Sequence, residues 1–291
     1  MIVCSAVDIM TPLLLAATGG LFTELAGMLN IALEGLMLTA AFAAVVAASA
    51  CQSLLAGLAV GILSSLALAL LFGAVTLRLK ANLFITGLAV NLLASGLTAV
   101  LSLRIFGSKG VILLEASSRL PALRLPGLEP LPLVGELLSG HNPFVYLSWV
   151  LLALSALILY QTPLGLRLRG AGKDPQTLVS LGLKPERYQL LAILFSGLSC
   201  GIAGSLLSLR LGAFVPNITA GRGWIALVAI YLGNRTPLGL LVAAFLFALA
   251  EAAANYAQGV LGVPTNFILA FPYLVTVLAM ILYSVLRRRG R

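Results

Sequence analysis

Long apolar runs are the feature that most constrains what this chain can fold into. Stretches of about 18 or more apolar residues with few charges recur along its length. Such a run forms a helix long enough to cross a hydrocarbon core of roughly 30 Å. The alternating polar and apolar pattern of an outer-membrane barrel is absent from these runs. The sequence therefore predicts an all-α polytopic membrane protein.

The runs leave no room for a separate soluble domain. The chain has 291 residues, of which 60% are hydrophobic and 9% charged, whereas a soluble domain carries about 25% charged residues. We expect a single transmembrane domain over 1–291 with about nine helical spans. These spans are expected at 9–24, 29–48, 53–76, 84–105, 143–160, 188–209, 223–234, 238–257 and 264–286.

A short string occurs twice in the chain. The pattern A-G-x-x-x-I-A-L is found at 26–33 and again at 220–227. This similarity predicts an internal duplication, with half-repeats at about 9–105 and 188–286. Duplicated halves that run in opposite directions are the build of many transporters, and their interface places a substrate path near the midplane.

The distribution of basic residues predicts the orientation. Lys and Arg gather at 78–80, 161–187 and 287–291, and such clusters mark cytoplasmic segments. The C-terminus is then cytoplasmic, the N-terminus external, and 106–142 forms an external loop that carries four prolines. With this topology the two copies of the repeated string are inverted. Arg222 is expected near the external interface, and the first and seventh spans are the short ones.

Composition also excludes several classes of function. A net charge of +9 is explained by topology determinants beside anionic lipid, so we predict no nucleic-acid binding. Three dispersed cysteines and one histidine make no metal-ligand spacing. No hydrolytic set of side chains is recognisable, so the chain is not expected to be an enzyme.

Small residues recur at every fourth position in several spans. The clearest series are Gly57, Gly61, Ser65, Ala69 and Gly73; Ala40, Ala44 and Ala48; and Gly197, Gly201 and Ser205. Helices approach closely along such faces. We therefore expect these faces to pack tightly, within one subunit or between subunits.

The cytoplasmic loop at 161–187 holds a predicted short helix. Asp174 is the expected N-cap, Pro175 the first helical residue, and Gly182 ends the helix. Leu178, Val179 and Leu181 are expected to be exposed, which suits docking into a partner's groove or lying on lipid. The pair Gly172-Lys173 lacks the other residues of a phosphate loop.

Six polar residues within the spans are candidates for a substrate path. They are Asn30, Glu34, Asn91, Ser95, Glu251 and Asn255. An ionisable side chain in mid-membrane costs roughly 2.5–3.5 kcal/mol, so it normally faces a partner or a wet path. Spacing of four residues places each carboxylate and amide on one helix face. The alternative is that these groups bond across helices or cap interrupted segments without meeting substrate.

Several segments resemble a known family. Residues 11–15, 19–24 and 27–37, then 169–182, 195–204 and 219–227, resemble nucleoside-type permease subunits of ABC importers, in the ribose and branched-chain amino-acid permease superfamily. The resemblance implies alternating-access import of a small polar heterocyclic solute such as a purine nucleoside, across a bacterial cytoplasmic (inner) membrane. It leaves riboflavin or a sugar open as cargo. An ion-coupled secondary transporter using Glu34 and Glu251 also stays open.

The resemblance further implies the partners. The loop residues Gly170, Gly172, Asp174, Pro175, Leu178 and Gly182 would form a coupling helix on a separate ATPase subunit, which would use the ATP. This chain itself would bind no cofactor. A second homologous permease or a second copy of this chain, an external solute-binding protein and membrane lipid would complete the set of partners.

Overall fold

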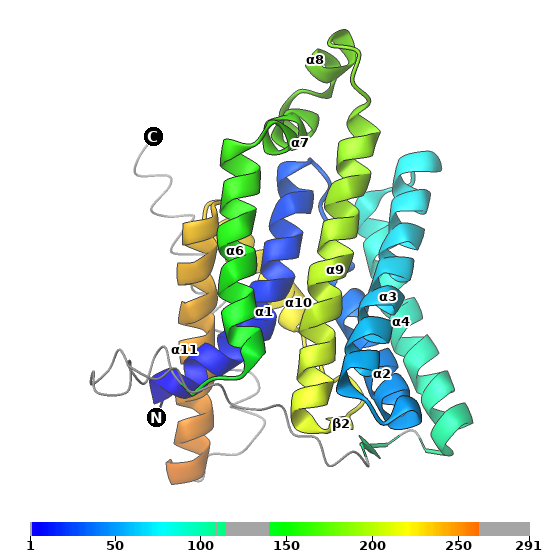
Figure 1. The fold of residues 1–291 in the computed structure, drawn as a ribbon, viewed down its shortest axis with the longest axis vertical. Helices are drawn as coiled ribbons and strands as arrows, with labels where there is room; N and C mark the ends of the chain where they lie inside the picture. The colour runs from blue at the N-terminus through cyan, green and yellow to red at the C-terminus, as the bar shows by residue number, and fades with distance from the viewer. Residues whose placement is uncertain (1, 109, 115–139, 262–291) are drawn as a thin grey trace.

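The fold is a bundle of helices that mostly run along one axis (Figure 1). The computed structural model describes residues 2–108, 110–114 and 140–261. Within that part, seven helices are long and apolar enough to cross a membrane. They are α1 (Ile2–Leu25), α2 (Leu33–Cys51), α3 (Leu54–Gly73) with its π-helical extension η1 (Ala74–Arg78), α4 (Leu83–Phe106), α6 (Pro143–Gln161), α9 (Pro185–Leu211) and α11 (Pro237–Leu261). The predicted all-α polytopic class is confirmed.

Three further helices of the described residues are too short to cross a membrane. They are α7 (Pro163–Lys173), α8 (Pro175–Ser180) and α10 (Arg222–Leu232). The 11 residues of α10 extend about 16 Å, roughly half the hydrocarbon thickness. The predicted span at 264–286 and the prolines of the predicted external loop lie outside the described residues. The number of spans therefore stays a prediction.

Side-chain caps explain where several helices begin. The Asn82 carboxamide accepts from the N–H groups of Phe84 and Ile85 at the start of α4, and Asn142 caps α6 in the same way. Thr162 caps α7 through its hydroxyl. These side chains accept from backbone donors that have no partner inside the helix.

The centre of the bundle is built on small residues. A Cβ added to Gly57 would lie 2.8 Å from Ala48 Cβ on α2, and one added to Gly197 would lie 2.7 Å from Ala69 Cβ on α3. On α9, a Cβ at Gly201 would lie 2.8 Å from Ile62 Cα of α3. The predicted close approach along small-residue faces is confirmed, and the structure shows that it joins α2, α3 and α9, since only small residues fit at these crossings.

The first span differs from its prediction. It was expected to be short, but α1 has 24 residues and continues through Pro12. The second span was expected from residue 29, but α2 begins at Leu33. The interruption therefore lies in the connection 26–32, where Gly27 has a φ of 76°, a conformation that favours glycine.

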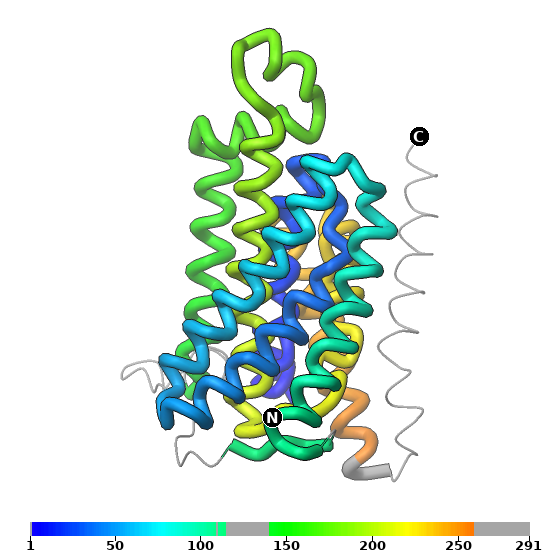
Figure 2. Tube along the Cα trace, turned by 90° about the vertical axis from the view of Figure 1, so that its right-hand side faces the viewer, coloured from blue at the N-terminus to red at the C-terminus, as the bar shows by residue number. Residues whose placement is uncertain are grey.

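The two ends of the bundle carry different features. At one end α7 and α8 project beyond the other helices, and the start of α1 lies at the opposite end (Figure 1). The opposite end also holds a two-stranded sheet, in which β1 (Ile112–Leu113) pairs antiparallel with β2 (Ala213–Phe214). Figure 2 shows α4 on the side away from α6. Which end faces the cytoplasm stays a prediction.

Candidate functional site

Glu34 joins the start of α2 to the start of α10. One carboxylate oxygen accepts from the Thr219 hydroxyl at 2.6 Å and from the Gly221 N–H at 2.9 Å. The other accepts from the Gly223 N–H at 2.7 Å. We call this contact the α2–α10 junction, defined by Glu34, Thr219 and Gly221–Gly223. It brings together segments 185 to 189 residues apart in the chain.

The junction has the chemistry of a helix N-terminus that holds an anion. Free N–H groups and the helix dipole give the start of α10 a partial positive charge, which a carboxylate stabilises. Gly221 has a φ of 78°, and a Cβ on Gly223 would lie 2.6 Å from Glu34 Cα. Glycine is therefore required for the carboxylate to come so close.

Arg222, which lies within the junction, forms an ion pair with α11. Its guanidinium lies 2.6 Å from Glu251 Oε1 on α11, and the two side chains are 21% and 23% exposed. Sequence reasoning placed Arg222 at the external interface and did not select it as a site residue. The signal that could have found it is the need of Glu251 for a cation inside a span.

Asn30 and Asn91 hold the unwound segment before α2. Asn30 is buried, donates to the Ser196 hydroxyl at 2.9 Å and accepts from the Ala32 N–H at 3.0 Å. Asn91 on α4 accepts from the Gly35 N–H at 2.8 Å and donates to the Ile31 carbonyl at 3.0 Å. The expectation that Asn30 and Glu34 share a helix face is wrong, because Asn30 precedes the helix.

Ser95 and Asn255 are not brought into the junction. Both side chains are exposed, although each stands one helical turn from a residue that makes a polar contact. Asn255 lines a hollow of about 460 Å³ with Asp8 and Arg210, which form an ion pair of 2.7 Å. The structure thus groups four of the six candidates near the starts of α2 and α10 and leaves two outside.

The far end of α10 is also held by a carboxylate. Glu24 accepts from the Tyr231 hydroxyl at 3.0 Å and lies 3.0 Å from the Arg235 guanidinium. Glu24 belongs to α1 and is 12% exposed. Both ends of this half-length helix are therefore tied to the first half of the chain by acidic side chains.

The predicted loop helix forms as α8. Asp174 accepts from the Thr177 N–H and hydroxyl, and these hydrogen bonds lower the pKa of its carboxyl below the ordinary value of 3.8. Pro175 is the first residue of the helix, and Gly182, with a φ of 74°, follows its end. The N-cap and the helix are confirmed.

The expected exposure of Leu178 is wrong. Its side chain is buried at 6%, whereas Val179 and Leu181 are 61% and 69% exposed. The reason is that 163–173 folds into α7, and Gly170 on α7 leaves room for Leu178, whose side chain would lie 3.6 Å from a Cβ there. Val179 and Leu181 are the apolar side chains that α8 offers to a partner.

Gly172 connects α7 to the segment before α2. A Cβ on Gly172 would lie 2.7 Å from the Ala26 carbonyl carbon, and one on Gly27 would lie 2.9 Å from Gly172 Cα. The Gln189 side chain on α9 also donates to the Ala26 carbonyl at 3.3 Å. We call this backbone contact the Gly27–Gly172 contact. It lies at the near end of the segment that leads to Asn30 and Glu34.

Comparison with known proteins establishes the family. Residues 2–282 match the family described as the permease component of the branched-chain amino acid transport system. The chain belongs to this family. Members of this kind are membrane transport subunits rather than enzymes, and an ABC permease implies an ATPase partner. The resemblance found in the sequence is confirmed.

Curated relatives cover nearly the whole chain. A guanosine ABC transporter permease of Bacillus subtilis is 30% identical, over 92% of this chain and 87% of the relative. A nucleoside ABC transporter permease of Lactococcus lactis is 29% identical, over 94% and 89%. A Haloferax volcanii permease, provisionally named for glucose, is 33% identical, over 97% and 91%.

One solved structure shares the fold. It is an inward-facing ABC transporter provisionally assigned to the metal-chelate type, with a TM-score of 0.54 and 19% identity, over 97% of this chain and 84% of that one. At this identity the likeness supports the architecture of an ABC transporter membrane subunit. The family match and the seven apolar helices of the described residues together make the chain a multi-pass membrane protein.

Proposed function

We propose that this chain is the permease subunit of an ATP-driven importer for a purine nucleoside. The observation that supports this choice of cargo is the match, over more than nine-tenths of the chain, to permeases named for guanosine and for nucleosides. The amides and carboxylates of the spans suit that cargo, because they pair with the donors and acceptors of a nucleobase edge and with ribose hydroxyls.

The candidate path runs past the α2–α10 junction. Glu34 and the Arg222–Glu251 pair are charged groups inside the bundle, and such groups normally line a wet path. Most of their polar atoms already have protein partners. Substrate would therefore reach the path by exchanging some of these hydrogen bonds during alternating access, while Asn30 and Asn91 keep the unwound segment in place.

The energy for transport would come from a separate ATPase subunit that docks on α8. Val179 and Leu181 offer an exposed apolar surface, and the Gly27–Gly172 contact links α7 to the segment that ends at Glu34. A movement of the α7–α8 pair would thus be transmitted to the start of α2. We place this end in the cytoplasm of a bacterial inner membrane, which puts the N-terminus outside.

The other partners follow from the same proposal. A second permease, either a homologous chain or a copy of this one, would complete the membrane unit, and an external solute-binding protein would deliver the nucleoside. Lipid would cover the remaining apolar faces.

Docking is tested by co-purification. The tagged chain is isolated in mild detergent from native membranes, and its partners are identified by mass spectrometry. We expect an ATPase subunit with the wild-type chain and its loss from Val179→Asp and Leu181→Asp. Leu113→Asp is the matched control, because Leu113 is 73% exposed at the opposite end. Retention of the ATPase by both α8 variants would contradict docking on α8.

Cargo is tested by uptake of labelled guanosine into cells that express the complete transporter. Unlabelled purine nucleosides should compete, and glucose and riboflavin should not. Glucose is the second candidate, because the relative provisionally named for glucose is 33% identical. Competition by glucose or riboflavin alone would overturn the nucleoside assignment, and uptake driven by an ion gradient without any ATPase would point to a secondary transporter.

A further inference from the structure

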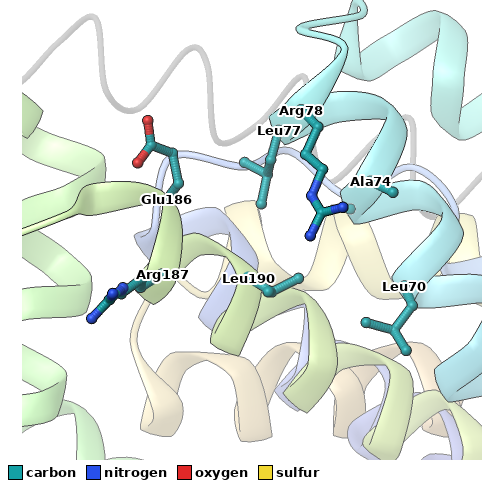
Figure 3. A pocket seen from close by; sticks show the side chains of 8 residues that line it. Leu70, Ala74, Leu77, Arg78, Glu186, Arg187 and Leu190 are labelled. Carbon is teal, nitrogen blue, oxygen red and sulfur yellow. The ribbon is translucent and has the colours of Figure 1, made fainter.

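A hollow of about 480 Å³ lies between the end of α3 and the start of α9 (Figure 3). Its apolar wall is formed by Leu70, Leu77 and Leu190, and its charged residues are Arg78, Glu186 and Arg187. It lies toward the α7–α8 end of the bundle, where the apolar helices give way to charged connections. It is separate from the α2–α10 junction and from the exposed residues of α8.

The hollow exists because two packed helices separate there. At Gly73 the helices are close, since a Cβ would lie 3.2 Å from Leu190 Cδ1. The next residues form the π-helical turn η1, in which the Leu79 N–H bonds to the Ala74 carbonyl. A π-turn shifts the chain out of the α-helical path. The end of α3 therefore leaves α9, and the space between them opens.

The hollow carries two arginines that lack carboxylate partners. Within the described part of the chain, neither Arg78 nor Arg187 forms an ion pair, and both are exposed. In Figure 3 the Arg78 guanidinium lies over the hollow, whereas the Glu186 carboxylate and the Arg187 guanidinium point away from it. Lys80 and Lys184 stand nearby in sequence, so the local charge is positive. This arrangement selects for an anion.

Apolar surface continues from the hollow along the bundle. Leu70 is 47% exposed, Leu71 44% and Leu63 63% on α3, and Leu191 on α9 is 46% exposed. A soluble anion would gain nothing from these side chains, whereas an acyl chain would cover them. Paired basic residues at the edge of an apolar helix surface are the pattern that binds anionic lipid headgroups.

We propose that this hollow binds an anionic phospholipid. Arg78 holds the phosphate over the hollow, and the exposed Arg187 side chain turns toward it when the lipid binds. Guanidinium groups bind phosphate oxygens through two parallel hydrogen bonds. One acyl chain lies over Leu70, Leu77 and Leu190. The lipid fills the space between α3 and α9, so its binding stabilises the packing of the two helices at this end. The proposal does not depend on the cargo.

The test is native mass spectrometry of the purified transporter complex after detergent exchange. Phosphatidylglycerol and phosphatidylcholine with identical acyl chains are added back in a titration. We expect phosphatidylglycerol to stay bound and phosphatidylcholine to dissociate. Arg78→Gln with Arg187→Gln should weaken phosphatidylglycerol binding about 30-fold, since each basic residue near an anionic lipid contributes about a factor of five.

Controls separate this site from general surface charge. Arg104→Gln removes an exposed arginine at the other end of α4 and should leave lipid binding unchanged, and the Tm of each variant shows that it is folded. Equal retention of the two lipids, or unchanged binding by the double variant, would overturn the proposal. So would full displacement of the lipid by inorganic phosphate, which would identify a site for a soluble anion. Loss of the ATPase without loss of lipid would assign the surface to that subunit.

Discussion

The starts of α2 and α10 solve one problem in two ways. α2 follows an interrupted segment and α10 is a half-length helix, and both begin among other helices. Unpaired backbone N–H groups are costly in such surroundings. The start of α2 is held by neutral amides, from Asn30 within the segment and Asn91 on α4. The start of α10 is held by the Glu34 carboxylate, which comes from the other half of the chain.

The difference concerns where charge is placed. The hydrogen bonds of the Asn30 and Asn91 side chains fix the backbone at the start of α2 without adding charge. This suits a purely structural role. The carboxylate at α10 brings a negative charge against the helix dipole, with the Arg222–Glu251 pair beside it. A solute that offers hydrogen-bond donors gains more at the charged start, because hydrogen bonds to a carboxylate are stronger than those to a neutral amide. We therefore expect transport to depend most on the α10 start and stability to depend on both.

The largest effect is expected from Gly223→Ala. The new Cβ would lie 2.6 Å from Glu34 Cα and 2.8 Å from its Oε2, so α2 and α10 must move apart. We expect a loss of about 3 kcal/mol in stability and no uptake. Thermal unfolding in detergent measures the first quantity.

Gly96→Ala is the matched control for that change. Gly96 lies within α4 with nothing within 4 Å of an added Cβ, so alanine should leave the Tm unchanged or raise it slightly. A Gly223→Ala protein as stable as the Gly96→Ala protein would show that α10 does not need close contact with Glu34.

Glu34→Gln should have the next largest effect. The carboxamide keeps one oxygen but turns an NH2 group toward backbone N–H or hydroxyl donors that now lack an acceptor. We expect about 2 kcal/mol of destabilisation and loss of uptake at a temperature where the variant is folded. Thr219→Val removes one of the three hydrogen bonds and should cost about 1 kcal/mol. Normal transport by Glu34→Gln would show that transport depends no more on the start of α10 than on the start of α2.

Asn91→Ala tests the neutral start. It leaves the Gly35 N–H and the Ile31 carbonyl without their side-chain partner, so we expect about 1–2 kcal/mol of destabilisation. Uptake by the folded variant should persist at a reduced rate, because no charge is lost. Ser95 is one turn away and exposed, so Ser95→Ala should change the free energy of unfolding by less than about 0.5 kcal/mol. Equal effects at both positions would contradict a supporting role for Asn91.

Local features of this molecule follow from the sequence alone. Apolar run length predicted where most of the helices lie, and the series of small residues predicted which helix faces pack tightly. The Asp174 N-cap and Gly182 predicted α8, because each of these residues affects only the backbone within a few residues of it. These features depend on neighbours in the chain, and a single sequence contains them.

Contacts between distant segments could not be predicted in the same way. Glu34 and Glu251 were recognised as costly charges, but their partners Gly223 and Arg222 depend on how α10 is placed. The start of α2 at Leu33 depends on Asn91 from another helix. Leu178 is buried because α7 folds against α8. In each case a long-range contact overrides the local pattern.

The smallest expected effect concerns Asp174, a cap in water rather than inside the bundle. Thr177 hydrogen bonds lower the pKa of its carboxyl below 3.8, so the ionised form favours the folded α8. That stabilisation is complete above pH 3.8 and is lost as the pH falls through the lower folded pKa. An NMR titration of the Asp174 carboxyl carbon should give a midpoint below 3.8, and Thr177→Val should move it upward. A midpoint at or above 3.8 in the wild-type chain would show that the cap is not formed in solution. Loss of the cap should weaken ATPase docking, because Val179 and Leu181 are the exposed apolar side chains proposed to meet that subunit.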